Sequence, residues 1–282
     1  MRVNKIEFTK NRENYAFYFP IEGKKQASSF KDILNGKKYP LLKAFHPRII
    51  LDVGANLGAT SMFFALNYPK AKIFSFEPTK MNFSWLKKNT ERFQNVVRVN
   101  KGAYFADTKT KIYLDSEVGG RNSIFKHWTN SDKYEVIDLL NFGKYLKSKE
   151  LIGTIDILKI DTEGCEIDIL CSIEYDLKNV GVIYLEYHGK ENEEAVMEIL
   201  SKSHVLVQKK AVSKQSRKVS LELLGSVCIE DVNIEGKTIL QSGKKITEAH
   251  IRELQALSIQ TISISSDSLG ELLFVNKKIS PK

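Results

Sequence analysis

The chain has 282 residues, of which 42% are hydrophobic and 27% charged, and these values exclude a disordered or fibrous protein. This length accommodates one sizeable α/β domain with an appendage. The formal net charge of +9 comes from lysines scattered through both halves of the chain, so we expect no nucleic-acid partner. No apolar run reaches the length of a membrane span and the first residues lack the pattern of a secretory signal, so we expect a cytoplasmic protein.

The three cysteines, Cys165, Cys171 and Cys228, form no CxxC pair and have no histidine at the spacing of a zinc site. We therefore expect buried free thiols and no metal site. Asp161 and Glu163 have oxygen ligands of the kind that Mg²⁺ prefers, but two acids alone do not establish a site.

Residues 1–45 precede the main domain. Residues 5–9 and 15–19 alternate apolar and polar side chains, as strands do. Ser29 is a candidate N-cap for a short helix. We expect this region to form an N-terminal cap or an extra hairpin.

The main domain covers residues 46–210 and alternates apolar runs with helical patterns. The runs, which we predict to be strands, are residues 48–53, 72–76, 96–99, 155–160 and 182–185. Strands that alternate with helices predict an α/β fold with right-handed crossovers and a mainly parallel sheet. Ligands bind such sheets at the carboxyl ends of the strands, so functional residues are expected there.

The end of the chain holds two further predicted strands, at 204–208 and 271–275, which could pair in antiparallel fashion as the close of the sheet, with the last covering about 270–277. The interval between them is too long for a hairpin loop. Residues 211–268 are therefore predicted to be an inserted ββαβ-like module, with segments at 224–232, 236–246, 247–257 and 261–264. A docking or homo-oligomer role and a purely structural role remain alternatives for it. The basic stretch 209–218 has the composition of a connection between strands.

A glycine turn, DVGANLG at residues 52–58, follows the first strand of the main domain. Gly54 permits a tight turn, and Gly58 lets the next helix begin close to the sheet. The first N–H groups of that helix are free to bind a ligand, so the turn, with Ala55 and Asn56, is a candidate cradle for a small molecule. Nicotinamide sites normally show G-x-G-x-x-G, whereas the spacing here is G-x-x-x-G, which disfavours a dinucleotide.

Two acids end neighbouring strands of the predicted sheet. Asp52 precedes the glycines and could bind an ammonium group directly or through water. Glu77 closes the second strand, where an acid binds the ribose hydroxyls in nucleoside-binding α/β folds. Together they predict a cofactor that has both an amino-acid end and a ribose, such as S-adenosylmethionine.

Charged residues crowd the end of the fourth strand, in the sequence IDILKIDTEGCE at 155–166. Lys159, Asp161 and Glu163 are candidates for a reactive centre, although Asp161 also suits a helix cap. The next strand ends near His188, which can take a proton near neutral pH. Asp161 and then His188 are the candidate general bases, with a structural role as the alternative for His188.

With DVGANLG, FEP and IDILKIDTEGCE in this order, the chain resembles the FkbM family of S-adenosylmethionine-dependent methyltransferases over about residues 46–210. The resemblance implies a Rossmann-like fold with a seven-stranded sheet. It implies that the residues of the glycine turn hold the methionine end of the cofactor and that Glu77 holds the ribose. It also implies that Lys159, Asp161 and Glu163 line the reactive mouth. The chain departs from the family pattern after residue 204, where the module is inserted.

We therefore predict O-methylation of a hydroxyl on a sugar, natural product or related small molecule, by in-line methyl transfer. The acceptor is a small molecule or a glycan. Two alternatives remain open, namely a non-catalytic binding protein on the same fold and a nucleotide-dependent oxidoreductase.

Overall fold

The computed structural model describes residues 3–20, 24–42, 44–115, 121–129, 131–218, 232–234, 237–240, 246–257, 259 and 261–279. The chain forms two compact units, one of residues 1–187, 191–209 and 271–282, the other of residues 188–190 and 210–270. The proposed division of the sequence at 45, 210 and 268 stays a prediction. In the part of the chain that is described, no helix has the length and apolar character needed to cross a membrane.

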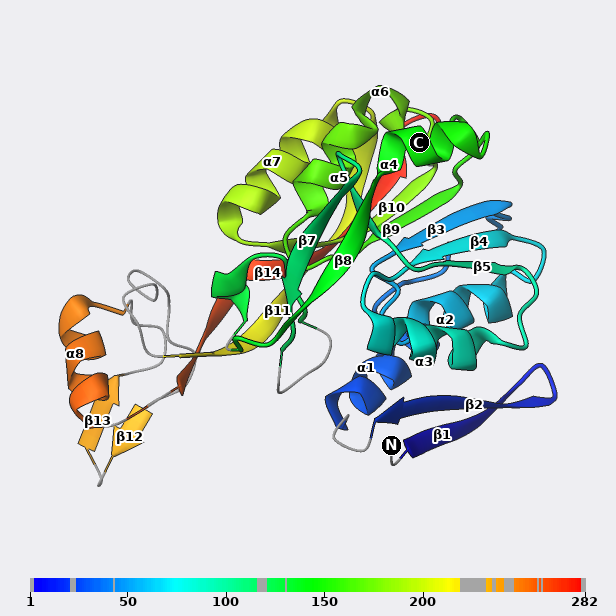
Figure 1. The fold of residues 1–282 in the computed structure, drawn as a ribbon. Helices are drawn as coiled ribbons and strands as arrows, with labels where there is room; N and C mark the ends of the chain where they lie inside the picture. Colours follow the sequence, from blue (N-terminus) through cyan, green and yellow to red (C-terminus); the bar gives the residue numbers. More distant parts are fainter. Residues whose placement is uncertain are drawn as a thin grey trace. The chain divides into compact units, whose positions relative to one another are not determined.

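A seven-stranded sheet forms the centre of the larger unit, in the order β11-β14-β10-β9-β3-β4-β5 (Figure 1). The strands are β3 (Ile49–Val53), β4 (Lys72–Phe76), β5 (Val96–Val99), β9 (Ile157–Ile160), β10 (Val182–His188), β11 (His204–Lys218) and β14 (Thr261–Asn276). The five strands from β10 to β5 are parallel, and Ile50 pairs with Ile157 on one side and Ile73 on the other. The predicted Rossmann-like fold with a mainly parallel seven-stranded sheet is confirmed.

Helices cover both faces of this sheet, because its strands are apolar on both sides. Leu51 and Leu158 face one core cluster, while their neighbours Ile50 and Ile157 face another. On the first face lie α4 (Phe142–Ser148), α5 (Glu166–Ser172), α6 (Glu174–Leu177) and α7 (Lys190–Ser201), and on the second lie α2 (Ala59–Asn67) and α3 (Lys80–Thr90) (Figure 1). All the parallel strands therefore end at one edge, where the candidate residues gather.

The N-terminal region packs against the second face as a hairpin followed by a helix. β1 (Val3–Lys10) and β2 (Glu13–Pro20) pair in antiparallel fashion, and α1 (Lys24–Leu34) follows. The rings of Phe17 and Phe30 stack at 4.1 Å between centroids, next to Met62 and Trp85. The prediction that Ser29 caps the helix is wrong, because the apolar stripe that contains Phe30 already begins at Ala27 and the helix extends a turn further back.

A second, three-stranded sheet lies beside the ends of β4 and β5 and was not predicted. Its order is β6-β8-β7, with β6 (Gly102–Tyr104), β7 (Thr108–Tyr113) and β8 (Tyr134–Asn141). A short 3₁₀ helix, η1 (Lys126–Trp128), lies between β7 and β8. Ile112, Ile137 and Leu139 form the apolar face of this sheet.

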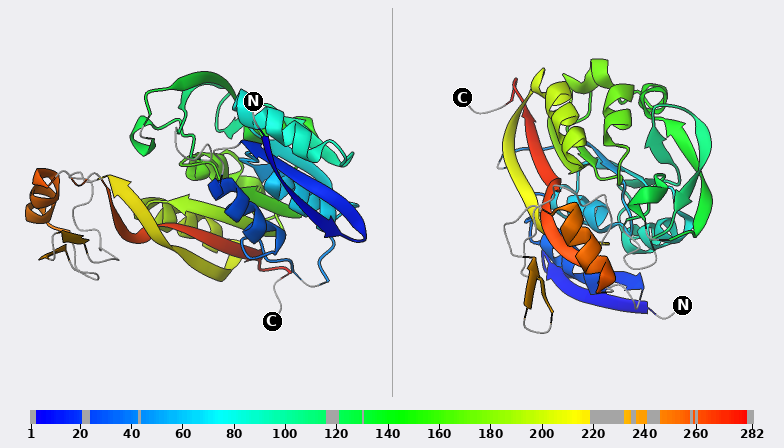
Figure 2. Two further views of the ribbon diagram at one scale, coloured as in Figure 1. Left: turned by 90° about the horizontal axis from the view of Figure 1, so that it is seen from below. Right: turned by 90° about the vertical axis from the view of Figure 1, so that its left-hand side faces the viewer.

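Strands β11 and β14 are much longer than the sequence indicated, as Figure 2 shows. The basic stretch 209–218 is the continuation of β11 rather than a connection, and residues 261–264 belong to the same strand as residues 271–275. Composition misled here because strands are held by backbone hydrogen bonds to their neighbours, which tolerate many side chains.

The smaller unit contains the hairpin of β12 (Val232–Ile234) and β13 (Lys237–Leu240) and the helix α8 (Glu248–Ala256). The Thr247 side chain caps α8 by accepting from the His250 N–H. Ile251 and Leu254 of the helix are buried with Leu240. Of the predicted strand at 224–232, residues 224–231 lie outside the described residues, as does Cys228.

Candidate active site

The chain turns sharply after β3, and this turn requires glycine. Gly54 has φ +77° and Gly58 has φ +89°. A Cβ at Gly54 would lie only 1.9 Å from the carbonyl oxygen of Asp161, where no side chain fits. The N–H groups of Gly54 and Ala55 donate to the carbonyl oxygen of Phe76, at the end of β4. The turn is therefore fixed between the ends of β4 and β9.

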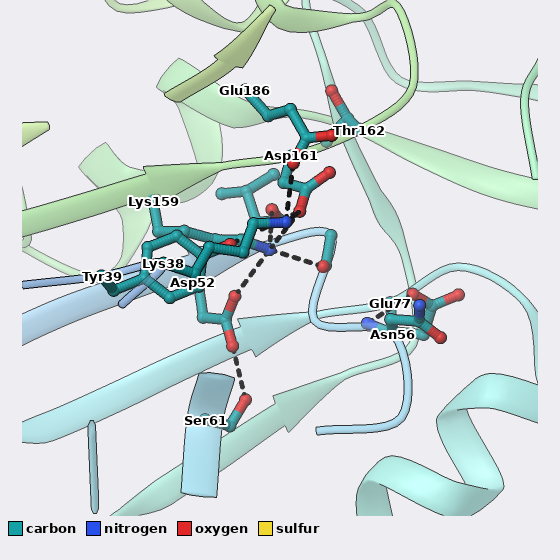
Figure 3. Close-up of polar contacts among 12 residues, drawn as sticks. Lys38, Tyr39, Asp52, Asn56, Ser61, Glu77, Lys159, Asp161, Thr162 and Glu186 are labelled. Atoms are coloured by element: carbon teal, nitrogen blue, oxygen red, sulfur yellow. Dashed lines mark hydrogen bonds and ion pairs between the residues drawn. The ribbon is translucent and has the colours of Figure 1, made fainter. Parts of the chain in front are cut away.

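A buried ion pair lies beneath the turn (Figure 3). Asp52 is fully buried, and its Oδ1 lies 3.1 Å from Lys159 Nζ, while its Oδ2 accepts from the Ser61 hydroxyl at 2.6 Å. Lys159 Nζ also donates to the carbonyl oxygens of Val53 and Gly54, at 3.1 and 2.7 Å. The pair thus fixes the backbone of the turn from below, and Asp52 is absent from the lining of both cavities described next.

Glu77, directly after β4, is buried on the other side of the turn. Its Oε1 accepts from the N–H and the hydroxyl of Thr79, and its Oε2 accepts from the Asn56 N–H at 2.9 Å. Burial raises the pKa of Glu77, although these hydrogen bonds and the charge of Lys159 oppose the shift. Three donors occupy this carboxylate, which has about four acceptor positions, so capacity for a further donor remains.

Asp161 and Glu186, at the ends of β9 and β10, share one lysine from the N-terminal region. Lys38 Nζ lies 3.2 Å from Asp161 Oδ2 and 2.7 Å from Glu186 Oε2. The Tyr39 hydroxyl donates to the same Asp161 oxygen at 3.4 Å. Burial alone would lower the pKa of Lys38, but the two carboxylates outweigh it and raise that pKa well above its usual value. Lys38 is therefore a permanent cation at this site.

Two cavities open at this edge of the sheet, and both include the glycine turn. Cavity A, of about 730 Å³ including its mouth, contains Glu77. Its other lining residues include a set from the end of β4 and the small sheet: Pro78, Gly102, Ala103, Ile112, Ile124, Ile137 and Leu139. Cavity B, of about 800 Å³, has walls from the N-terminal region and the ends of β9 and β10: Phe17, Phe30, Ile33, Lys38, Tyr39, Lys159 and Glu186.

The two cavities share one wall, whose residues line both. These residues are Gly54, Asn56, Asp161 and Glu163. The structure therefore brings together two of the predicted turn residues with two of the four predicted catalytic residues, while Ala55 lines only cavity B and Gly58 lines neither cavity. Lys159 reaches only cavity B, although its side chain is almost wholly buried.

Several lining residues carried no sequence signal. Lys38 and Tyr39 lie in the N-terminal region and Arg121 lies in the segment before η1, and all three line cavity B. Predicted candidate His188 is the last residue of β10 and is half-buried, but it is not among the lining residues of either cavity. Its role as a general base stays a prediction.

Among the described residues, no group of three His, Cys, Asp or Glu side chains is arranged to hold a metal ion. Cys165 is buried at the edge of cavity A. The prediction of a buried thiol is wrong for Cys171, which is exposed because it lies in the last turn of α5 on the side away from the sheet core.

Comparison with known proteins adds the family to this geometry. A model of the methyltransferase FkbM domain matches residues 52–209, more than half of the chain. The chain belongs to the FkbM methyltransferase family. It is a methyltransferase.

Individual relatives of the chain are distant in sequence. Methyltransferase 1 of Beauveria bassiana is 24% identical over 193 residues, covering 61% of this chain and 76% of that protein. The hexuronic acid methyltransferase AglP of Haloferax volcanii is 21% identical over 192 residues, covering 67% and 77%. Among solved structures, the precorrin-6y C5,15-methyltransferase of Geobacter metallireducens aligns over 89% of each chain, with 13% identity and a TM-score of 0.43.

The extent of the FkbM match divides the two cavities. Every residue that lines cavity A lies within residues 52–209. Cavity B takes part of its wall, including Phe30 and Lys38, from residues that precede the match. Cavity A therefore belongs wholly to the family domain, and cavity B does not.

Proposed function

We propose that this methyltransferase uses S-adenosylmethionine bound in cavity A to methylate a hydroxyl oxygen of a sugar-like or natural-product acceptor bound in cavity B. The observation that carries the proposal is the shared wall of Gly54, Asn56, Asp161 and Glu163. A methyl donor and an acceptor must meet at one point, and this wall is common to the two cavities.

The residues of cavity A fit the cofactor. Glu77 has acceptor capacity for a ribose hydroxyl, and its burial makes such a hydrogen bond strong. Asn56 has a buried Oδ1 without a hydrogen-bond partner among the described residues, which suits a ligand donor. The apolar side chains of Ile112, Ile137 and Leu139 suit the flat face of an adenine ring.

Asp52 supports the cofactor indirectly in this proposal. It is fully buried, and its two oxygens contact Lys159 and Ser61. Its effect on a bound ligand would pass through Lys159, which holds the carbonyl oxygens of Val53 and Gly54. The turn backbone, rather than the Asp52 carboxylate, would then face the methionine end.

The acceptor class follows from the two kinds of wall in cavity B. Phe17, Phe30 and Ile33 form an apolar side, while Lys38, Arg121 and the shared acids form a polar side. A ring with an apolar face and several hydroxyl groups matches both sides. That a relative is named a hexuronic acid methyltransferase supports a sugar acceptor.

When bound, the cofactor supplies a methyl group activated by its sulfonium charge. Glu77 and the glycine turn would hold the cofactor, and the acceptor oxygen would take the methyl group from its sulfur as the hydroxyl proton passes to Asp161. The residues of the shared wall hold the acceptor oxygen in line, and such positioning is worth on the order of 7–11 kcal/mol. Asp161 accepts the hydrogen bond of the acceptor hydroxyl and takes its proton, an effect of about 10²–10⁴-fold in rate. Positioning therefore outweighs proton transfer.

A labelled-methyl assay tests the proposal. The purified chain, with S-adenosylmethionine, is incubated with a panel of monosaccharides, uronic acids and hydroxylated aromatic compounds, and methylated products are identified by mass spectrometry. We expect a methyl ether on at least one sugar, with equal release of S-adenosylhomocysteine. Thermal stabilisation by NAD and not by S-adenosylmethionine would contradict it.

A further inference from the structure

The contact between the N-terminal region and the ends of β9 and β10 concentrates charge at one point. A single ammonium, Lys38 Nζ, lies within 3.2 Å of Asp161 and 2.7 Å of Glu186 (Figure 3). The side chains of Lys38, Asp161 and Glu186 are 18%, 21% and 12% exposed, so water screens this cluster only in part. Lys38 therefore bridges two carboxylates that end neighbouring strands.

The backbone that carries Lys38 is anchored to the sheet. The Tyr39 ring is buried and meets the Tyr184 ring edge-on, at 5.6 Å between centroids. The Tyr184 hydroxyl donates to the carbonyl oxygen of Pro40 at 2.6 Å. These contacts, made by the two residues that follow Lys38, restrict where the ammonium can go, as a positioning role requires.

Other charged groups lie near Lys38 on the neighbouring strands. Lys159 of β9 lies 4.0 Å from Asp161 and is itself paired with Asp52 of β3. Glu271 of β14 adds a negative charge that raises the pKa of Lys38 further. Burial raises the pKa of Tyr39 well above its usual value, so Tyr39 remains a neutral donor to Asp161. Lys38 thus has an excess of negative neighbours and cannot itself act as a base.

We propose that Lys38 is a positioning residue that holds Asp161 ionised and directed at the shared wall of the two cavities. This inference rests on the proposed function, because it assigns the Asp161 carboxylate to the place where the sulfonium and the acceptor hydroxyl meet. Tyr39 assists by donating to the same carboxylate oxygen.

Removal of the ammonium has a defined chemical consequence. Two carboxylates that lose the cation bridging them ionise together less readily, and the pair retains one proton to higher pH. Lys159 remains 4.0 Å from Asp161, but it is already paired with Asp52. In Lys38→Met, Asp161 and Glu186 would share that proton at mildly acidic pH. The shared wall would then have less negative charge to stabilise a sulfonium. At alkaline pH the proton would leave, and the negative charge would be restored.

Calorimetry with two ligands tests this consequence without an acceptor. S-adenosylmethionine bears the sulfonium charge and S-adenosylhomocysteine lacks it, so the ratio of their dissociation constants reports the charge at the wall. We expect Lys38→Met to reduce the preference for S-adenosylmethionine roughly tenfold near pH 6, equivalent to about 1.4 kcal/mol, and to approach the wild-type ratio near pH 8.5.

Three further variants make the test specific. Lys38→Arg retains the charge and should keep the wild-type ratio at both pH values. The double variant Lys38→Met/Glu186→Gln removes the second carboxylate, so the ratio of the two dissociation constants should no longer depend on pH. This variant replaces Lys38→Met in the test if Lys38→Met does not fold. Lys37→Met is the matched control, because Lys37 is an exposed neighbour whose ammonium lies 3.5 Å from the exposed residue Asp32.

A Lys38→Met protein with the wild-type ratio at both pH values would overturn the inference and leave the proposed function intact. If the wild-type chain binds neither ligand, the proposed function fails first and this inference with it. A general loss of stability would weaken the binding of both ligands alike and would not change their ratio.

Discussion

The two cavities differ in how they are built and in what they contain. Cavity A is enclosed by strand ends and by the small sheet, and its three acids lie among mainly apolar residues, with no cationic side chain among the described residues that line it. Cavity B contains three cationic and three acidic side chains, and part of its wall comes from outside the family domain. A mostly apolar cavity that lies within the family domain suits a ligand common to the family. A charged cavity with an added wall suits a ligand specific to this chain.

In the proposed function, this difference separates the cofactor site from the acceptor site. The end of a parallel sheet supplies a fixed frame for one ligand, because its turns are held by backbone hydrogen bonds. Cavity B, the proposed acceptor site, is completed by a hairpin and helix that can change without disturbing that frame. Three substitutions would break or sharpen this comparison.

Loss of the buried lysine should have the largest effect, because it lies under the wall common to both cavities. Lys159→Met leaves Asp52 as a fully buried charge without its cation, and we expect a loss of about 3–5 kcal/mol in the free energy of unfolding. Urea denaturation measures it. The double variant Lys159→Met/Asp52→Asn should recover part of the loss, and a double variant that is less stable than Lys159→Met would show that the pair is not the cause.

Substitution of the turn glycine should follow in size. Gly54→Ala combines a positive φ with a Cβ placed 1.9 Å from a backbone oxygen, so we expect about 3 kcal/mol of destabilisation. Gly153→Ala is the matched control, since Gly153 has φ +79° and nothing lies within 4 Å of its added Cβ. That control should cost only about 1–2 kcal/mol from its backbone conformation. Equal losses in the two variants would mean that the close approach to Asp161 is not important.

Under conditions in which the variant is folded, Gly54→Ala should also weaken S-adenosylmethionine binding by about a hundredfold, because the turn must move away from β9. Gly153→Ala should bind as the wild type does. Isothermal titration calorimetry compares the two.

The smallest of the three effects concerns cavity A alone. Glu77→Gln keeps the shape of the side chain but removes its charge, and we expect S-adenosylmethionine to bind about tenfold more weakly, as for loss of one hydrogen bond to a charged group. Binding unchanged in this variant would place the ribose elsewhere.

The same variant has a pH signature whose sign is fixed by the raised pKa of Glu77. In the folded chain this group binds its proton more tightly than in the unfolded chain, so its contribution to stability is present at low pH and is lost as pH rises through the folded value. Relative to Glu77→Gln, the wild type should therefore lose stability as pH rises from the ordinary value of 4.5 through the raised pKa of Glu77. Urea denaturation across this range checks the sign, and a wild type that gains stability over the same range would contradict it.

Much of the fold and part of the site could be predicted because their signals are local. The turn at residues 52–58 and Glu77 follow directly from predicted strands, and strands in parallel sheets end at one edge. The small sheet was missed because β6 has only three residues and β7 is largely polar and exposed. Short strands of that kind have no clear period in the sequence.

Lys38 could not be predicted for a different reason. It is separated from Asp161 by 123 positions and from Glu186 by 148, and nothing near Lys38 in the sequence indicates either partner. The contact depends on how the N-terminal region packs against the sheet, which is a tertiary property. The case of Asp52 is different. The sequence predicted that Asp52 lies at the end of a strand, but not that its carboxylate is fully buried, because a strand pattern does not show that Lys159 pairs with it.

The central claim, that Glu77 and the glycine turn hold the cofactor in cavity A beside the shared wall, is tested most directly by a crystal structure with S-adenosylhomocysteine. We expect the ribose hydroxyls at hydrogen-bond distance from Glu77, the adenine against Ile137 and Leu139, and the sulfur next to the shared wall. A ligand bound in cavity B, or a ribose that does not contact Glu77, would contradict the account.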